Sequence, residues 1–246
     1  MRDLRPRSAA PAPLSDAQVA QRREWYAHLT RPGGRIHDRW GRDEVRAALA
    51  VLSDGCCAWC GALLNSGWPV DHYLPKERFP ELAYCWENLL PSCTACNTVR
   101  KRGYSPPGLN DRSLIDPALS ESEGRAHYKP DTLLATLSPR LVEPTVEDPA
   151  VHLKFEPVKA GYTQLSPIGD TTRRTLFHEA EKDFATRMAG LSADVEWRVK
   201  NARSPDALRE GLMVLIRLVG SRVYVEAYAR MWLALLRPDW GAAPVP

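Results

Sequence analysis

Two closely spaced pairs of cysteines are the clearest chemical feature of this sequence. The pairs are Cys57-Ala58-Trp59-Cys60 and Cys93-Thr94-Ala95-Cys96. Each pair can present two thiolates to one metal ion from a tight turn, and four thiolates form a closed tetrahedral zinc site. A closed site leaves no coordination position for a substrate, so its role is to stabilise the chain. The spacing therefore predicts a structural zinc ion held by Cys57, Cys60, Cys93 and Cys96.

The two remaining cysteines carry a weaker signal. Cys56 could compete with Cys57 as a ligand, but the Cys-x-x-Cys spacing of Cys57 and Cys60 fits a zinc turn better. Cys85 is predicted to be a small buried hydrophobic residue.

The segment between the cysteine pairs contains a further pattern of polar residues. An apolar residue precedes Asp71-His72-x-x-Pro, Asn88-Leu89-x-Pro follows, and the second cysteine pair runs directly into Asn97 and basic residues. Over about 57–101 this arrangement resembles the zinc-knuckle subtype of the HNH (ββα-metal) endonuclease family. The third motif position holds Asn97, where the name of the motif has histidine, and asparagine occurs at that position in the family.

A narrower resemblance extends beyond the motif. The run from Asp71 to Leu89, the segment Leu114-Ile115-Asp116-Pro117 and the segment 148–155 are similar to the HNH proteins of Septu and retron-associated anti-phage systems. In those systems the HNH protein acts beside an ATPase subunit. The resemblance therefore implies a nuclease of antiviral defence with an ATPase partner, which nothing in the composition indicates.

Each motif residue has a chemical reason for its type. We expect Asp71 to bind the catalytic metal ion and His72 to be the general base, because a neutral imidazole with a pKa near 6.5 can accept a proton at physiological pH. By the resemblance, Asn97 is the second oxygen ligand, and Asn88 holds the hairpin and orients His72. Oxygen ligands favour Mg²⁺ or Mn²⁺ over zinc as the catalytic ion.

Nucleic acid is the substrate that the resemblance implies, with DNA favoured over RNA. The metal ion would neutralise charge on the phosphate and on the leaving oxygen. Four basic residues flank the motif and are expected to contact phosphates without sequence preference. They are Lys76, Arg78, Arg100 and Lys101.

The elements that must position these residues are indicated by caps and apolar spacing. Ser15 and Gln18 form a capping-box pattern for a helix over 18–29. A second helix is expected from Asp43, as its cap, to the turn at 53–55, which leads straight into the first cysteine pair. A polar helix is predicted over 94–102.

The second half of the chain is predicted to be a covering layer followed by helices. Strands are expected at 152–155 and 162–165 around an Ala160-Gly161 turn. From 171 onward the pattern is helical, with Ser204 as a cap and Pro205 at a first helical position. The C-terminal bundle should contain about three or four helices.

The predicted fold class is α+β: a ββα-metal HNH core stapled by the four-cysteine zinc site, with N-terminal helices and a C-terminal helical bundle. The expected divisions are an Arg-rich segment and helix at 1–45, the nuclease core at 46–112, a loop-rich covering layer with short strands at 113–170, and the bundle at 171–246.

Composition and charge limit the class of protein. The chain has 246 residues, 44% hydrophobic content and a formal net charge of +3, so global charge does not establish a nucleic-acid partner. The Arg-rich N-terminal segment could follow a phosphate backbone or form an exposed solubilising arm. The N-terminus lacks the apolar run of a secretory signal and no stretch is long enough to span a bilayer, so we expect a cytoplasmic protein with no membrane partner.

Two other functions compete with the endonuclease. One is a catalytically silent zinc module that only binds nucleic acid or a protein, although binding alone needs no general base. The other is a dithiol oxidoreductase, which would need an exposed cysteine pair with a lowered thiol pKa and no bound metal. The tryptophans could stack on bases, but such residues are more often packing residues and none is given a role.

Overall fold

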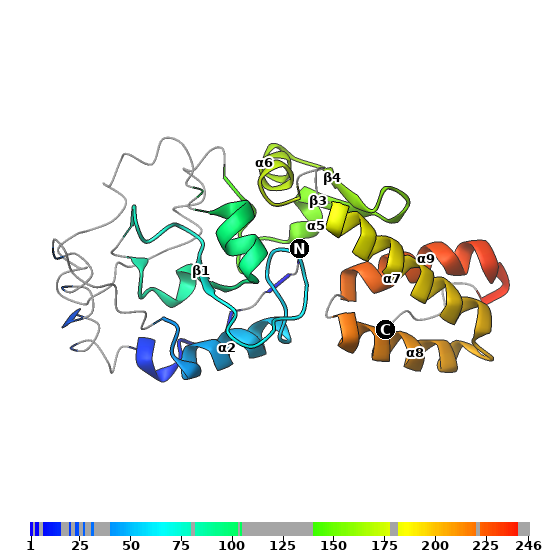
Figure 1. The fold of residues 1–246 in the computed structure, drawn as a ribbon, viewed down its shortest axis with the longest axis horizontal. Helices are drawn as coiled ribbons and strands as arrows, with labels where there is room; N and C mark the ends of the chain where they lie inside the picture. The colour runs from blue at the N-terminus through cyan, green and yellow to red at the C-terminus, as the bar shows by residue number, and fades with distance from the viewer. Residues whose placement is uncertain are drawn as a thin grey trace.

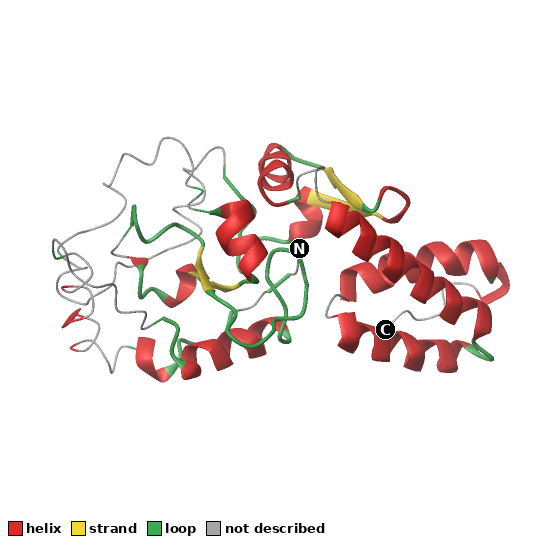
Figure 2. Ribbon diagram, in the orientation of Figure 1, coloured by secondary structure: helices red, strands yellow, loops and turns green. Residues whose placement is uncertain are grey.

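The computed structural model has helices and two small sheets, and confirms an α+β architecture (Figures 1 and 2). It describes residues 1, 3–4, 7–15, 20, 23–24, 27, 31, 40–79, 82–102, 104, 140–177, 182–219 and 222–240. Figure 1 shows β1 (Val70–His72) and α2 (Asp43–Ser53) in one part of the molecule and the three helices α7 to α9 (182–236) in another. Strands β3 (Leu153–Glu156) and β4 (Gly161–Gln164) and helix α6 (Pro167–Leu176) lie near the junction. The helix expected over 18–29 and the segment 114–117 lie largely or wholly outside the described residues.

Helix α2, Asp43–Ser53, supports the part of the chain that carries the motif. Val45 and Leu49 are fully buried on one face, and the helix packs against strand β2. Asp43 is the first residue of the helix and not its cap, which is Arg42. The helix ends at the predicted turn, where Asp54 has the left-handed conformation with a φ of 51°. That turn delivers the chain to the first cysteine pair.

A two-stranded antiparallel hairpin contains Asp71 and His72. Strand β1, Val70–His72, pairs with strand β2, Leu89–Pro91, so that Asp71 lies opposite Leu90 and His72 opposite Leu89. The short helix η4, Trp86–Asn88, leads into β2. Every residue of both strands is buried. The hairpin is therefore an interior element.

The helix predicted over 94–102 follows this hairpin and is found as η5, Ala95–Lys101. It has the π-helical form, in which each backbone hydrogen bond spans five residues. This form is rare in proteins, and where it occurs it is often at a functional site. The order is two antiparallel strands and then a helix, with the second cysteine pair at the point where β2 gives way to η5.

A second hairpin and helix α6 lie beyond the motif. Helix α5, Pro149–His152, precedes strand β3, Leu153–Glu156, which pairs with β4, Gly161–Gln164, as the sequence predicted within about one residue. Helix η7, Pro157–Lys159, forms the connection. Helix α6, Pro167–Leu176, then crosses α5 so closely that a Cβ on Gly169 would lie 1.9 Å from the carbonyl oxygen of His152. Only glycine fits this crossing.

Three long helices form the C-terminal bundle. They are α7, Lys182–Asn201, α8, Pro205–Val219, and α9, Arg222–Leu236, followed by the short η8, Pro238–Trp240. Ser204 caps α8 and Pro205 is its first residue, as predicted. Phe155 of β3 joins the bundle core against Tyr224 and Tyr228, with ring centroids 4.7 and 5.8 Å apart. Among the helices of the described ranges, none is both long and apolar enough to cross a membrane.

Part of the described N-terminal segment packs inside the molecule, so these residues form no exposed arm, although others such as Asp3 and Ser8 are exposed. Leu4 is 3% exposed, and its backbone N–H donates to the carbonyl oxygen of Pro144. Arg7 donates to the carbonyl oxygens of Trp86 and Leu89 at 2.6 and 2.9 Å. The segment continues into the short helix η1, Ala12–Leu14, whose Leu14 is fully buried. The side chain of Arg7 therefore connects the N-terminal segment to η4 and β2.

Candidate functional site

The four predicted zinc ligands come together in one cluster. The sulfur atoms of Cys57, Cys60, Cys93 and Cys96 all lie within 4.8 Å of one another, and those of Cys60 and Cys93 are 3.7 Å apart. Tetrahedral zinc–sulfur bonds of about 2.3 Å put ligands about 3.8 Å apart, so the cluster has the dimensions of a single zinc site. The four cysteines are positioned to bind a metal ion such as zinc, as the sequence predicted.

Local backbone bonds shape the two cysteine turns. In the first turn the N–H of Cys57 donates to the carbonyl of Ala62 and that of Gly61 donates to Cys57, with a φ of 69° at Gly61. In the second turn the N–H of Asn97 donates to the carbonyl of Cys93. The N–H of Ala58 reaches the carbonyl of Pro91 at the end of β2. The first turn is therefore attached to the strand that leads to the second.

The electrostatics of the cluster favour a bound cation. Burial raises the pKa of the Cys57 thiol, while a hydrogen bond from Cys57 lowers the pKa of Cys93 to about 7. Four thiolates so close together, three of them buried and that of Cys93 half-buried, repel one another unless a cation compensates them. Arg100 supplies part of this charge, because its Nη1 donates to the sulfur of Cys96 at 3.2 Å.

Cys56 and Cys85 stay outside the cluster, as expected. Both are buried. The thiol of Cys56 donates to the carbonyl of Asp54 at 3.4 Å, and that of Cys85 donates to a carboxylate oxygen of Glu87 at 3.1 Å.

The carboxylate of Asp71 lies between the first cysteine turn and η5. Its Oδ2 accepts the indole N–H of Trp59 at 2.7 Å, and its Oδ1 accepts from the ammonium of Lys101 at 3.0 Å. The side chains of Asp71 and Lys101 are only 3% and 1% exposed. Both oxygens thus have a donor, and the cysteine turn is connected directly to the predicted metal ligand.

His72 follows Asp71 on β1 and is buried with a defined hydrogen-bond partner. Its Nε2 lies 3.0 Å from the carbonyl oxygen of Ala83, and the ring packs edge-on to Trp40 with centroids 4.8 Å apart. A carbonyl can only accept, so Nε2 carries the hydrogen and Nδ1 has the free lone pair. Burial, and then the charge of Lys76, lower the pKa of His72 to about 3. The expected value near 6.5 is wrong for this environment, and the imidazole is neutral at physiological pH.

Asn88 fixes the chain on either side of His72. Its Oδ1 accepts from the N–H of Leu74 at 2.8 Å, and its Nδ2 donates to the carbonyls of Leu74 and Leu82. Leu82 directly precedes Ala83, whose carbonyl binds His72. The side chain is fully buried and all of these contacts are to backbone. Asn88 therefore ties the end of β1 to the segment that holds the imidazole.

Three other predicted site residues are half-buried or exposed. Asn97 is half-buried on η5, while Lys76 is half-buried beside Trp40 and paired with Glu77. Arg78 is exposed.

Two of the expected phosphate contacts are engaged inside the protein. Arg100 faces the sulfur of Cys96, and Lys101 is 2% exposed. The assignment of Lys101 as a phosphate contact needs correction, because its ammonium is used by Asp71 and by the carbonyl of His72, at 2.6 Å.

Two contributors to the site were not identified from the sequence, and a third, Lys101, was predicted only as a phosphate contact. The two are the indole of Trp59 and the carbonyl of Ala83, and the third contributes its buried ammonium. The position of Trp59 inside the first cysteine pair is the one sequence signal that could have linked it to Asp71, because the turn and the hairpin must meet for zinc to bind. The other two depend on tertiary contacts that spacing does not encode.

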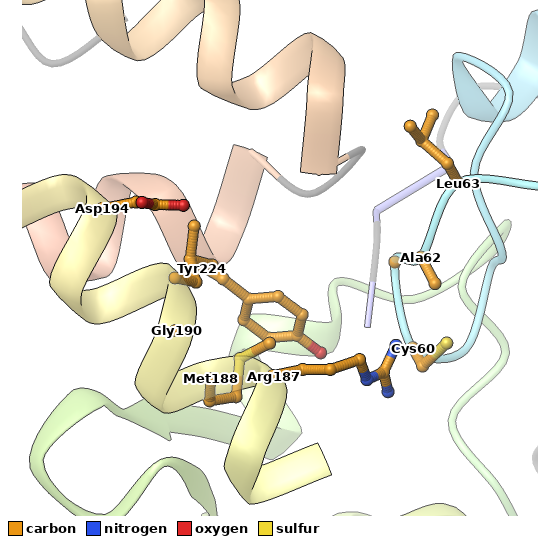
Figure 3. A pocket seen from close by; sticks show the side chains of 10 residues that line it. Cys60, Ala62, Leu63, Arg187, Met188, Gly190, Asp194 and Tyr224 are labelled. Carbon is orange, nitrogen blue, oxygen red and sulfur yellow. The ribbon is translucent and has the colours of Figure 1, made fainter. Parts of the chain in front are cut away.

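A cavity of about 420 Å³ lies between the first cysteine turn and the bundle (Figure 3). Cys60 and Leu63 line it on one side, with Met188 and Leu191 of α7 and Tyr224 of α9 on the other. Figure 3 shows the guanidinium of Arg187 reaching toward Cys60 across this space. Asp71 and His72 do not line it, so the cavity is separate from the hairpin site.

Comparison with known proteins gives two similar proteins, both named Septu protein PtuB. The one from Bacillus thuringiensis is 39% identical over 61 residues, which are 24% of this chain and 24% of that protein. The one from Bacillus mycoides (strain KBAB4) is 27% identical over 129 residues, 46% of this chain and 39% of that protein. The matched stretches thus span about a quarter to two fifths of these relatives. No protein-family model and no solved structure matches the chain.

Proposed function

We propose that this protein is a metal-dependent HNH endonuclease that hydrolyses phosphodiester bonds of nucleic acid. The main support is the placement of Asp71 and His72 as successive residues of β1, where separate partners fix a buried carboxylate and a neutral imidazole. A helix follows the hairpin, and a four-cysteine cluster joins the two ends of the segment. A protein that only binds nucleic acid would not need a buried, oriented imidazole.

His72 is the proposed general base. With its Nε2 hydrogen directed to Ala83, the lone pair of Nδ1 is the group that can take a proton from water. The carbonyl of Ala83 also favours the imidazolium that forms, because its hydrogen bond with Nε2 is stronger when the ring is charged. An approaching phosphate would raise the proton affinity of the imidazole further, since a nearby negative charge favours the charged form. Asn88 is a positioning residue that maintains this arrangement.

Asp71 and Asn97 are the proposed oxygen ligands of a catalytic Mg²⁺ or Mn²⁺. Carboxylate and amide oxygens are hard donors, so the donor types fit such an ion. Each carboxylate oxygen of Asp71 has one N–H donor and keeps further lone-pair positions. When bound, the cation would supply charge neutralisation at the phosphate and at the leaving oxygen.

Lys76 and Arg78 are the proposed phosphate contacts, and DNA is the proposed substrate. Both side chains reach the surface just beyond β1, and Lys76 is close enough to His72 to influence its pKa. Lysine and arginine at such positions hold the phosphate backbone without reading the sequence.

The proposed biological role is anti-phage defence together with an ATPase subunit. The similarity to two proteins named Septu protein PtuB supports this role. Septu systems combine more than one protein, so the nuclease is expected to need its partner for full activity.

A cleavage assay with two variants tests the nuclease. The zinc-loaded protein, with the proposed ATPase partner, is incubated with plasmid DNA and Mg²⁺ or Mn²⁺. We expect His72→Ala to lower the cleavage rate by about 10²–10⁴, since that is the usual cost of a lost general base. Excess metal should partly restore Asp71→Ala but not His72→Ala, because only Asp71 contributes to ion affinity. Cleavage at the parent rate by both variants would remove the HNH assignment.

The alternative is a catalytically silent zinc module that binds nucleic acid or a partner protein. One observation favours it: Asp71 and His72 are only 3% and 5% exposed. In that case the parent and the His72→Ala variant should bind DNA equally and neither should cut it, with or without the ATPase subunit.

A further inference from the structure

The contact between Lys101 and Asp71 places a cation of the protein itself at the carboxylate proposed to bind metal. We propose that the ammonium of Lys101 occupies the cation position at Asp71, so that a divalent ion binds there only when Lys101 gives way. This inference rests on the proposed function, because it concerns the regulation of the same site. Lys101 would then be a positioning residue that sets the affinity of the site for metal.

The contacts of Lys101 are those of a group that replaces an ion. An ammonium has three N–H donors and no acceptor. The Nζ of Lys101 lies 3.0 Å from Oδ1 of Asp71 and 2.6 Å from the carbonyl oxygen of His72, and sits 6.0 Å from the ring centre of Trp59. Two oxygens and an aromatic face surround it. Lysine is almost never so buried unless it is paired with an opposite charge.

Lys101 and the proposed metal ligand Asn97 lie on the same face of η5. Asn97 and Lys101 are four residues apart on η5, and side chains at this separation lie on the same side of a helix. A metal ion held by Asp71 and Asn97 would therefore lie close to the Nζ of Lys101. Like charges at such a distance in a buried site repel strongly. The ammonium of Lys101 and a divalent ion therefore cannot both be bound at the carboxylate of Asp71.

Because Asp71 is buried, competition between Lys101 and a metal ion should change the stability of the fold. Removing one partner of a buried ion pair leaves an uncompensated charge and destabilises the fold. An added cation that takes the vacated position should restore the lost stability, because a ligand of the folded state stabilises it. The parent protein should show no such dependence at the same metal concentration, since Lys101 already compensates Asp71.

The test uses the zinc-loaded full chain and measures melting temperature and Mn²⁺ affinity, not cleavage. Lys101→Met should melt below the parent without Mn²⁺, and added Mn²⁺ should raise its melting temperature while leaving the parent nearly unchanged. Calorimetry should give a Mn²⁺ dissociation constant at least about tenfold lower for Lys101→Met, because the competing charge is gone. Mn²⁺ prefers oxygen ligands and should leave the thiolate-bound zinc in place. Lys200→Met, which removes the exposed ion pair with Glu196 on α7, is the matched control and should gain no response to Mn²⁺.

Two further variants keep the test decisive. Asp71→Asn combined with Lys101→Met should abolish the Mn²⁺ response, because a neutral amide needs no cation. Lys101→Gln, whose amide can still donate to the carbonyl of His72, should respond to Mn²⁺ as Lys101→Met does. An equal Mn²⁺ response of the parent and Lys101→Met would overturn the proposal. So would the failure of both Lys101 variants to fold in the presence of Mn²⁺, because the ion should then replace the ammonium. None of these readouts requires cleavage, so a failed nuclease assay leaves them interpretable.

Discussion

Trp59 donates its indole N–H to the carboxylate of Asp71 at 2.7 Å, although the two residues belong to different parts of the site. Trp59 lies between two cysteines of the metal-binding cluster, and Asp71 lies in the middle of β1. The contact transmits the position of the cysteine turn to the carboxylate. The stability of the hairpin site therefore depends on the cysteine cluster through a single hydrogen bond as well as through the backbone.

Replacing Trp59 with phenylalanine should destabilise the protein while leaving zinc bound. The ring remains, but the carboxylate of Asp71 loses a donor in a buried position. A hydrogen bond to a charged group contributes about 1.5–3 kcal/mol, so we expect a loss of this size in the free energy of unfolding, measured by urea titration. Trp197→Phe on α7, where the side chain is 63% exposed, should change it by less than about 0.5 kcal/mol. Equal stability of Trp59→Phe and the parent would show that the hydrogen bond contributes nothing net.

Loss of a zinc ligand should unfold the region around the hairpin. Cys57→Ser or Cys93→Ser removes one of four thiolates, and the binding free energy of a structural zinc ion is part of the folding free energy. A loss on the order of 3–5 kcal/mol would lower the melting temperature by about 10 °C for a chain of this size. Scanning calorimetry together with zinc analysis measures both effects.

The control for the zinc ligands is Cys56→Ser. Cys56 is also buried but its sulfur lies outside the four-sulfur cluster. The Cys56→Ser protein should still contain one equivalent of zinc. Loss of zinc from Cys56→Ser and not from Cys57→Ser would reassign the ligand.

The buried imidazole of His72 should make the protein less stable at acidic pH. Its pKa falls from an unfolded value of about 6.5 to about 3 in the folded protein, mainly through burial. Between these values the unfolded chain binds a proton that the folded one does not, so the contribution is complete above pH 6.5 and is lost as the pH falls toward 3. The parent should therefore lose several kcal/mol, on the order of 3–5, from this group alone.

Comparison with His72→Gln isolates that contribution. The difference in the free energy of unfolding between parent and variant should be constant above pH 7 and should shift in favour of the variant at pH 5. Carboxylates titrate in the same range but are common to both proteins, so they cancel. A pH-independent difference would mean that His72 titrates normally in the folded state.

The crossing of α6 over α5 predicts a large effect for a small substitution. In Gly169→Ala the new methyl group would lie 1.9 Å from the carbonyl oxygen of His152, so the two helices must separate. Overpacking of this kind costs about 1–3 kcal/mol or more. Gly190→Ala on α7 adds the same group where nothing lies within 4 Å, and should stabilise the helix by about 0.5–1 kcal/mol. Chemical denaturation of both variants checks the contrast in sign.

The features that could be predicted from the sequence are those encoded by near neighbours. The spacing of Cys57 and Cys60 identifies a metal-binding turn because its geometry depends on a few adjacent residues. Ser204 marks the start of α8 for the same reason, since a cap acts on the next three residues. The Ala160-Gly161 turn likewise located the second hairpin.

The features that could not be predicted depend on contacts between distant segments. A basic residue after the second cysteine pair is typical of a phosphate contact, but the packing of η5 on β1 turns Lys101 inward. The pKa of His72 depends mainly on its burial in the folded chain, which no local pattern records. Arg7 shows the same effect, because an arginine in a proline-rich segment is expected in solvent and here binds backbone carbonyls of the interior.

The cysteine cluster also affects how freely the sequence of the hairpin segment can change length. Cys60 precedes β1 and Cys93 follows β2, so the metal site clasps the hairpin at both ends. Closing a longer loop between fixed ends costs little free energy, because the entropic cost of closure grows only with the logarithm of loop length. Insertions between Glu77 and Arg78 on the exposed side of this segment should therefore be tolerated, while the register of Asp71 and His72 is retained. The cysteine cluster thus allows the loop to vary in length around a site whose geometry stays constant.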